Sequence, residues 1–153
     1  LAVVASKQAS EVIAIDVNPY AIHCAKHNAK LNGVSEKIDF LRGDLFAPLN
    51  DIEYFDVILF NAPYVPSEEN EIDFWLGRSW SGGLTGRTVI DRFISQAPKH
   101  LRPKGKILLL QSTLTSTSET IKNFSAHRLK TEIIASHALP FFETLILFEA
   151  KRY

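Results

Sequence analysis

The segment Phe55–Phe60, with the sequence FDVILF, runs directly into Asn61-Ala62-Pro63-Tyr64. A continuous apolar run of this length is typical of a strand buried inside a sheet. Ala62 precedes a proline, which biases its backbone toward extended conformations and stiffens the segment. A stiff exit that carries an amide side chain, backbone carbonyls and an aromatic ring predicts a site for a planar ligand at the end of this strand.

The composition is that of one globular domain spanning residues 1–153. The 17 basic and 17 acidic residues give a formal net charge of +0, which weakens the case for a polyanion-binding surface. A lone cysteine, Cys24, excludes an internal disulfide and a multi-cysteine zinc site. No apolar run approaches a membrane span and no signal peptide is visible, so we expect no membrane partner and a cytoplasmic location.

Strand and helix patterns alternate on both sides of this segment. The helix after the first strand is bounded by Asn18 as N-cap, Pro19 at its first position and Gly33 as its stop. The segment Pro66–Gly86 is predicted to be a loop. Two C-terminal strands, joined by the short loop His137–Phe142, predict an antiparallel hairpin. The predicted strands are residues 11–16, 37–41, 54–60, 106–110, 128–135 and 143–150, and the further helices are residues 89–101 and a short one at 121–124.

This order predicts an α/β fold with an open, mostly parallel sheet, helices on both faces and a C-terminal antiparallel hairpin. Ligands of such sheets bind beyond the carboxyl ends of the strands. Asp16, Asp44 and Asn61 each lie at such an end, so we expect them on one rim. A carboxylate at the position of Asp16 typically binds a ribose hydroxyl. Asp44 can accept from the exocyclic amine of adenine while Leu45 offers its backbone amide, although either aspartate alone also suits an exposed turn.

The ordered motifs resemble those of one enzyme family. They are Asp16–Pro19 (DVNP), Gly43–Phe46 (GDLF), the tetrapeptide Asn61–Tyr64 and Trp80–Gly83 (WSGG). This set resembles the HemK-related S-adenosylmethionine-dependent methyltransferases, in particular the archaeal and eukaryotic branch of the release-factor glutamine N5-methyltransferases. The resemblance implies a Rossmann-like class I methyltransferase fold over the whole chain and S-adenosylmethionine as cofactor.

The resemblance also implies a role for each motif residue. Asp16 would bind the ribose of the cofactor, and Asp44 with Leu45 would bind its adenine. Asn61, Pro63 and Tyr64 would be the catalytic residues, with Asn61 contacting both cofactor and substrate. The amide of Asn61 and the carbonyl of Ala62 would accept hydrogen bonds from the substrate NH₂, while Tyr64 packs on the amide plane. No metal is expected, because the reaction rests on positioning and on favouring the charge that develops on nitrogen.

Two features depart from the family pattern. Ala62 stands where proline is usual, which predicts reduced preorganisation because the main-chain carbonyl is kept and rigidity is lost. The glycine-rich cofactor loop and the strand before it are absent, so we expect an N-terminally truncated domain. The absent strand would lie between Glu11–Asp16 and Tyr54–Phe60, and about 40–60 upstream residues would supply it.

Three functions remain open at this level. The first is methylation of a glutamine side chain in a translation release factor. The alternative is methylation of an exocyclic amine of adenine or guanine in RNA or DNA, which offers a similar hydrogen-bond pattern to Asn61. The third is a non-catalytic binding module.

Further contacts are expected around the site. The resemblance suggests a small zinc-binding activator protein, for which the edge strand Lys37–Leu41 is the expected docking position. Trp75 and Trp80 are expected to be a substrate lid or core anchors. Arg78 and Arg87 are candidate substrate contacts.

Overall fold

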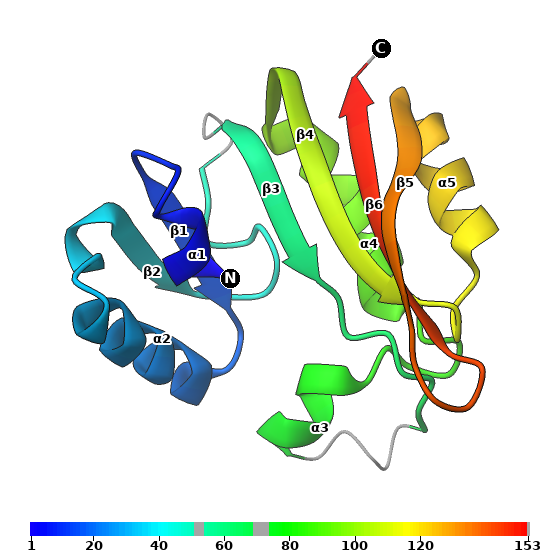
Figure 1. The fold of residues 1–153 in the computed structure, drawn as a ribbon, viewed down its shortest axis with the longest axis horizontal. Helices are drawn as coiled ribbons and strands as arrows, with labels where there is room; N and C mark the ends of the chain where they lie inside the picture. Colours follow the sequence, from blue (N-terminus) through cyan, green and yellow to red (C-terminus); the bar gives the residue numbers. More distant parts are fainter. Residues whose placement is uncertain (51–53, 69–73, 153) are drawn as a thin grey trace. The chain divides into compact units, whose positions relative to one another are not determined.

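The computed structural model describes residues 1–50, 54–68 and 74–152. They belong to two compact units, Leu1–Asn50 and Asp51–Tyr153. Each unit has a sheet of its own (Figure 1). Among the described residues, β1 pairs only with β2, and β3 pairs only with β4.

The first unit is a two-stranded parallel sheet with helices packed on it. Val12 lies opposite Ile38, and Asp16 lies opposite Arg42, so both strands end at the same rim. The unit consists of α1 (Ala2–Ala5), β1 (Val12–Asp16), α2 (Pro19–Leu31), η1 (Ser35–Lys37) and β2 (Ile38–Arg42).

Helix α2 has the boundaries that its local sequence predicts. The Oδ1 of Asn18 accepts a hydrogen bond from the backbone N–H of Tyr20 at 2.9 Å, and Pro19 opens the helix. Past the last turn, Gly33 has a φ of +67°, which a residue without a Cβ adopts at little cost. The turn after β1 and the direction of α2 are therefore fixed by local chemistry.

The second unit is a four-stranded sheet in the order β3-β4-β6-β5. β3 and β4 are parallel, while β4 pairs antiparallel with β6 and β6 antiparallel with β5. Helices α4 and α5 lie together on one face of this sheet (Figure 1). The elements are β3 (Phe55–Asn61), α3 (Trp75–Trp80), α4 (Thr88–Gln96), η3 (Ala97–His100), β4 (Leu101–Ser112), α5 (Thr117–Ala126), β5 (Leu129–Ala138) and β6 (Thr144–Arg152).

The core of the second unit supports the end of β3. Ile90, Phe93 and Ile94 of the amphipathic helix α4 are buried against the sheet. The rings of Phe60 and Phe93 stack with centroids 4.2 Å apart. This packing anchors the residue immediately before Asn61 on the covered face of the sheet.

Three predicted boundaries were wrong. The segment predicted as a loop at 66–86 contains helix α3, while residues 69–73 of its acidic start lie outside the described residues. The helix predicted to run to Leu101 ends at Gln96, because the ring of Pro98 cannot continue an α-helix and the chain turns into the 3₁₀ turn η3. Strand β4 is longer than predicted and spans Leu101–Ser112.

Candidate active site

Asn61 is the last residue of β3 and is exposed to solvent. It lies opposite Leu110 of the neighbouring strand β4. The next residue, Ala62, is only 4% exposed, and its backbone N–H donates to the carbonyl of Leu110 at 3.4 Å. The start of the tetrapeptide is therefore attached to β4 one residue beyond the strand, while the amide of Asn61 remains accessible.

The chain after the tetrapeptide lies alongside the segment that follows α3. Val65 forms an isolated parallel bridge with Ser81. The backbone N–H of Val65 donates to the carbonyl of Trp80 at 2.9 Å, and that of Gly82 donates to the carbonyl of Val65 at 2.9 Å. A buried hydrogen bond joins the hydroxyls of Ser67 and Ser81. This pairing brings Trp80 beside Asn61 and Tyr64.

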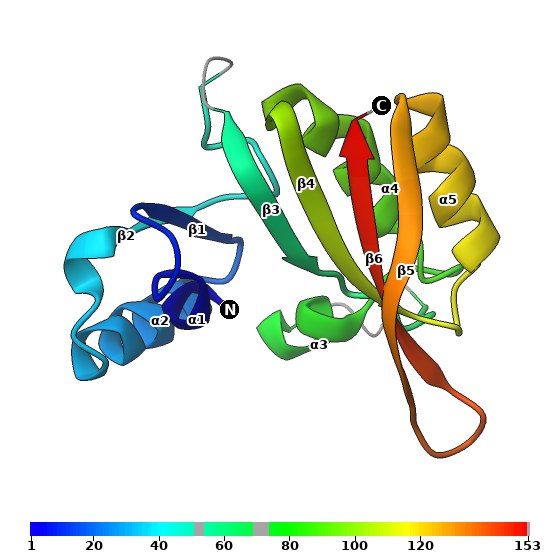
Figure 2. The same cartoon turned by 45° about the horizontal axis from the view of Figure 1, so that its top comes forward.

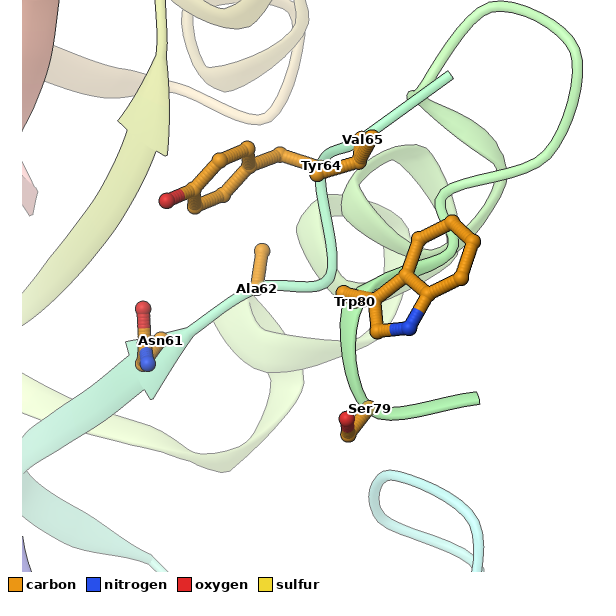
Figure 3. Close-up of a pocket in the computed structure, with 6 residues that line it drawn as sticks. All are labelled: Asn61, Ala62, Tyr64, Val65, Ser79 and Trp80. Atoms are coloured by element: carbon orange, nitrogen blue, oxygen red, sulfur yellow. The ribbon is translucent and has the colours of Figure 1, made fainter. Parts of the chain in front are cut away.

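A small pocket of about 120 Å³ opens at this point (Figure 3). The rings of Tyr64 and Trp80 lie on opposite sides of the Ala62 backbone, with Asn61 at the strand end. A hollow lined by an amide side chain and by residues with aromatic rings suits the end of a planar, polar side chain. Its lining consists of Asn61, Ala62, Tyr64, Val65, Ser79 and Trp80.

Tyr64 is held in its neutral form. Partial burial raises the pKa of its hydroxyl above the ordinary value, and the nearby carboxylate of Glu143 raises it further. Both effects disfavour the tyrosinate. Tyr64 can therefore offer a ring face and an O–H group but no negative charge near neutral pH.

Arg87 does not point to a substrate contact, contrary to expectation. It is 4% exposed and donates to the carboxylate of Asp91 at 2.6 Å and to the hydroxyl of Thr120 at 3.1 Å. Its Nε lies 2.9 Å from the carboxylate of Glu119, and it also donates to the carbonyl of Ser116 at 2.5 Å. Arg87 therefore joins the start of α4 to α5.

The two tryptophans have different surroundings. Trp80 lines the pocket, whereas Trp75 lies under the guanidinium of Arg78, 5.2 Å from its ring centroid. A cation over an indole face is a favourable contact. Of the two, Trp80 is the candidate for contact with a substrate.

The predicted cofactor residues lie together on the first unit. The exposed carboxylate of Asp16 accepts from the backbone N–H of Asn18 at 2.8 Å. The backbone carbonyl of Asp16 accepts a hydrogen bond from the N–H of Gly43 at 3.0 Å. This bond brings the turn that contains Asp44 and Leu45 to the end of β1. Two carboxylates on one rim fit the hydroxyl and amine donors of an adenosine. Asn61, Ala62, Pro63 and Tyr64 lie on the other unit.

The pocket also contains residues that the sequence did not reveal. Val65 and Ser79 line it because residue 65 pairs with residue 81, a contact that no local pattern encodes. The pair Gly82-Gly83 was the available signal. The backbone N–H of Gly82 donates to Val65 and its carbonyl accepts from Thr88. Only glycine fits at this position, because a Cβ on residue 82 would collide with the backbone of Gly86.

Comparison with solved structures defines the class of fold. The ribosomal protein L11 methylase of Lactobacillus delbrueckii matches with a TM-score of 0.67 at 18% identity, over 99% of this chain and 64% of that one. The Mtq2–Trm112 complex of E. cuniculi matches with a TM-score of 0.61 at 19% identity, over 99% of this chain and 91% of that one. The fold is that of the Rossmann-like class I methyltransferases, as predicted.

Comparison of sequences defines the family. A putative protein N5-glutamine methyltransferase of Methanocaldococcus jannaschii is 44% identical over 144 residues, which are 94% of this chain and 71% of that protein. The release factor glutamine methyltransferase of Gloeobacter violaceus is 34% identical over 115 residues, 71% of this chain and 40% of that protein. Human methyltransferase HEMK2 is 32% identical over 111 residues, 70% of this chain and 50% of that protein.

The chain belongs to the protein N5-glutamine methyltransferase family, the HemK-related group that its motifs resemble. The predicted enzyme class and S-adenosylmethionine as cofactor are thereby confirmed. A family model described as RNA cap guanine-N2 methyltransferase also matches residues 2–74. The chain spans half or less of the G. violaceus and human relatives.

Among the described residues, no group of three or more His, Cys, Asp or Glu side chains is arranged to hold a metal ion. In the same ranges, no helix combines the length and the apolar character that crossing a membrane requires.

Proposed function

We propose that this protein transfers a methyl group from S-adenosylmethionine to the side-chain nitrogen of a glutamine in a translation release factor. The observation that carries the proposal is the exposed amide of Asn61 at the end of β3, in a small pocket with the rings of Tyr64 and Trp80. The names of the G. violaceus relative and of the Mtq2–Trm112 complex, which methylates the termination factor eRF1, support a release factor as substrate.

The pocket residues act by positioning. The amide oxygen of Asn61 and the carbonyl of Ala62 accept the two N–H bonds of the substrate amide, which orients its nitrogen lone pair. Because these bonds strengthen as positive charge develops on nitrogen, they favour the transition state over the ground state. Tyr64, neutral and aromatic, packs on the amide plane. When bound, S-adenosylmethionine would supply its sulfonium methyl group and be left as a neutral thioether. The nitrogen that gains the methyl group would lose one of its two N–H protons to solvent.

The test is methylation of a purified release factor by the full-length protein, measured by mass spectrometry. Asn61→Ala is expected to lower kcat/KM by about 10²–10³, the typical effect of losing one preorganised polar group. Asn32→Ala is the matched control, because Asn32 is exposed at the end of α2. Equal activity of the Asn61→Ala and Asn32→Ala variants would exclude the proposed role of Asn61.

A second candidate function is methylation of an exocyclic amine in RNA. The observation that favours it is the guanine-N2 methyltransferase model, since residues 2–74 contain the aspartates and the tetrapeptide. The basic residues near the start of β4 give it little support. Arg102 is paired with Asp56 at 2.8 Å, and Lys106 with Glu149 at 3.2 Å. They lie at the end of β4 remote from Leu110, the partner of Asn61. Incubation with RNA and release factor together distinguishes the two acceptors.

We also propose a small zinc-binding activator protein that adds a strand to the free edge of β2. The edge supports this, because β2 pairs only with β1 among the described residues. The presence of a partner protein in the Mtq2–Trm112 complex supports it further. Adding the partner should slow hydrogen exchange at the amides of Ile38–Arg42, and unchanged exchange there would exclude this position.

A cytoplasmic location is likewise proposed. The exposed thiol of Cys24 suits a reducing compartment, and cell fractionation tests the location directly.

A further inference from the structure

The hairpin of β5 and β6 ends in a tip with two exposed phenylalanines. The tip, Leu139–Glu143, is closed by a hydrogen bond from the N–H of Leu139 to the carbonyl of Glu143 at 2.8 Å. Phe141 is 96% exposed and Phe142 is fully exposed. Figure 2 shows this end of the hairpin projecting beyond the ends of β3 and β4. The two rings therefore contact little of the protein itself.

The tip leaves the sheet at the same end as the acceptor pocket. Leu110 of β4 lies opposite Asn61 on one side and opposite Leu147 of β6 on the other. Strand β6 begins three residues before Leu147, at Thr144. The N–H of Thr144 donates to the hydroxyl of Thr113 at 2.9 Å, just past the end of β4, so the tip follows the same end of the sheet. The carboxylate of Glu143 contributes to the raised pKa of the Tyr64 hydroxyl, which is consistent with this placement.

The conformation of the tip is unfavourable for the isolated fold. Phe141 and Phe142 have φ values of +62° and +63°, a region that residues with a Cβ seldom adopt. Each ring also remains in water, although aromatic side chains contribute most when buried. Exposed apolar groups at the rim of a functional site are typical of a binding surface.

The charges around the tip favour a protein over a nucleic acid. The part of the hairpin near the tip, residues 133–148, contains no lysine or arginine, and its one acidic residue is Glu143. Single-stranded nucleic acids stack on aromatic rings only where cations also neutralise the phosphates. An apolar depression on a folded protein needs no cations and accepts aromatic anchors well.

We propose that Phe141 and Phe142 form an aromatic anchor that binds an apolar depression on the protein substrate beside its methyl-accepting glutamine. This inference rests on the proposed function and specifies how the acceptor protein is held. The pocket then receives the glutamine side chain, while the tip recognises the surface next to it. Specificity for a folded substrate comes from the tip, and chemistry comes from the pocket.

The test compares two substrates with the full-length protein. One is the folded release factor, and the other is a short peptide around the glutamine that lacks the adjoining surface. The double variant F141A/F142A is expected to raise KM for the folded factor by about tenfold or more, the typical effect of losing an anchor. Its kcat should stay within about twofold of the wild type, as should KM for the peptide. Tyr54→Ala, at the opposite end of β3, is the control.

The outcomes separate the two proposals. If the unaltered protein methylates RNA and not the release factor, the proposed function fails. If it methylates the release factor and F141A/F142A leaves KM for the folded factor unchanged, the anchor fails while the function stands. An equal rise in KM for peptide and folded factor would also overturn the anchor, since it would indicate damage to the pocket. Thermal unfolding of the variant checks that the exposed substitutions leave the fold intact.

Discussion

Ala62 combines two roles in this site that a proline would separate. Its carbonyl is the proposed second acceptor for the substrate NH₂, and its N–H donates to Leu110 at 3.4 Å. A proline would keep the carbonyl, fix the backbone before Pro63 and remove that long hydrogen bond. Alanine at position 62 therefore keeps the hydrogen bond to β4, whereas proline would give a more rigid tetrapeptide without that bond.

The substitution Ala62→Pro is expected to raise kcat/KM by about two- to fivefold, which corresponds to the 0.4–1 kcal/mol effect of restricting a compatible backbone. Ala62→Gly should change kcat/KM in the opposite direction. Steady-state kinetics on the release factor measures both. The same kcat/KM for all three proteins would show that backbone rigidity at residue 62 does not limit the reaction.

At the scale of elements, a buried polar network holds the ends of α4, α5 and β4 together. Arg87 contacts Asp91, Thr120 and the carbonyl of Ser116. The hydroxyl of Thr120 donates to the amide of Gln111 on β4 at 2.6 Å. Arg87, Gln111 and Thr120 are buried, so the network stabilises this unit and is not available for contact with a substrate.

Arg87→Ala is expected to lower the free energy of unfolding by about 1–3 kcal/mol, because it leaves buried acceptors without their donor. This loss of stability is smaller than for a fully buried ion pair. The carboxylates of Asp91 and Glu119 are about half exposed, so water can hydrate them once the guanidinium is removed. Urea unfolding measures the change.

Arg102→Ala is the matched control, because the Arg102–Asp56 pair is exposed and should contribute less than about 1 kcal/mol. Equal destabilisation by the two substitutions would contradict a structural role for Arg87.

Glu149 of β6 makes the stability of the sheet depend on pH. A hydrogen bond from Lys151 at 2.5 Å, aided by Lys106 at 3.2 Å, holds the pKa of Glu149 below its ordinary value. The unfolded chain therefore binds a proton more readily than the folded one. The stabilisation is present above the ordinary glutamate pKa of about 4.3 and is lost as the pH falls through the lowered pKa.

Glu149→Gln is expected to flatten the loss of stability between about pH 5 and pH 3. Urea unfolding midpoints measured across this range provide the test. Glu36→Gln is the control, because Glu36 is an exposed carboxylate of η1 in the first unit and lies outside the sheet that contains Glu149. If the unfolding midpoint of the Glu149→Gln variant fell with pH as steeply as that of the unaltered protein, the pH dependence would come from other carboxylates.

Elements with local signals could be predicted, and elements defined by distant contacts could not. The limits of α2 follow from Asn18, Pro19 and Gly33, each of which acts on its own backbone. Helix α3 was missed because it has six residues and no side-chain cap. The tetrapeptide could be predicted from its own sequence. Trp80 could not be placed beside it, because that contact depends on the pairing of Val65 with Ser81, sixteen residues further along the chain. The burial of Arg87 likewise depends on α5.

At the scale of the whole molecule, the residues with predicted roles are divided between the two units. Asp16 and Asp44 lie at the strand ends of the first unit, and the acceptor tetrapeptide follows β3 in the second. The chain covers 71% of the M. jannaschii relative. Cofactor binding and acceptor binding can therefore be tested separately by substitutions in different units.

Asp16→Ala is expected to raise the Kd for S-adenosylhomocysteine by about tenfold or more, since hydrogen bonds to a charged group contribute about 1.5–3 kcal/mol. Calorimetric titration of the full-length protein measures it, and Asp39→Ala, an exposed carboxylate on β2, is the control. Equal affinities of the two variants would remove Asp16 from the cofactor site. Failure of the unaltered protein to bind S-adenosylhomocysteine would contradict the assigned cofactor.

The most direct test of the central claim is the mass spectrum of a release factor and an RNA incubated together with the full-length protein and S-adenosylmethionine. We predict one added methyl group on a glutamine side chain of the release factor, absent when Asn61→Ala replaces the unaltered protein. A methyl group on the RNA alone, or on the release factor at a residue other than glutamine, would contradict the account.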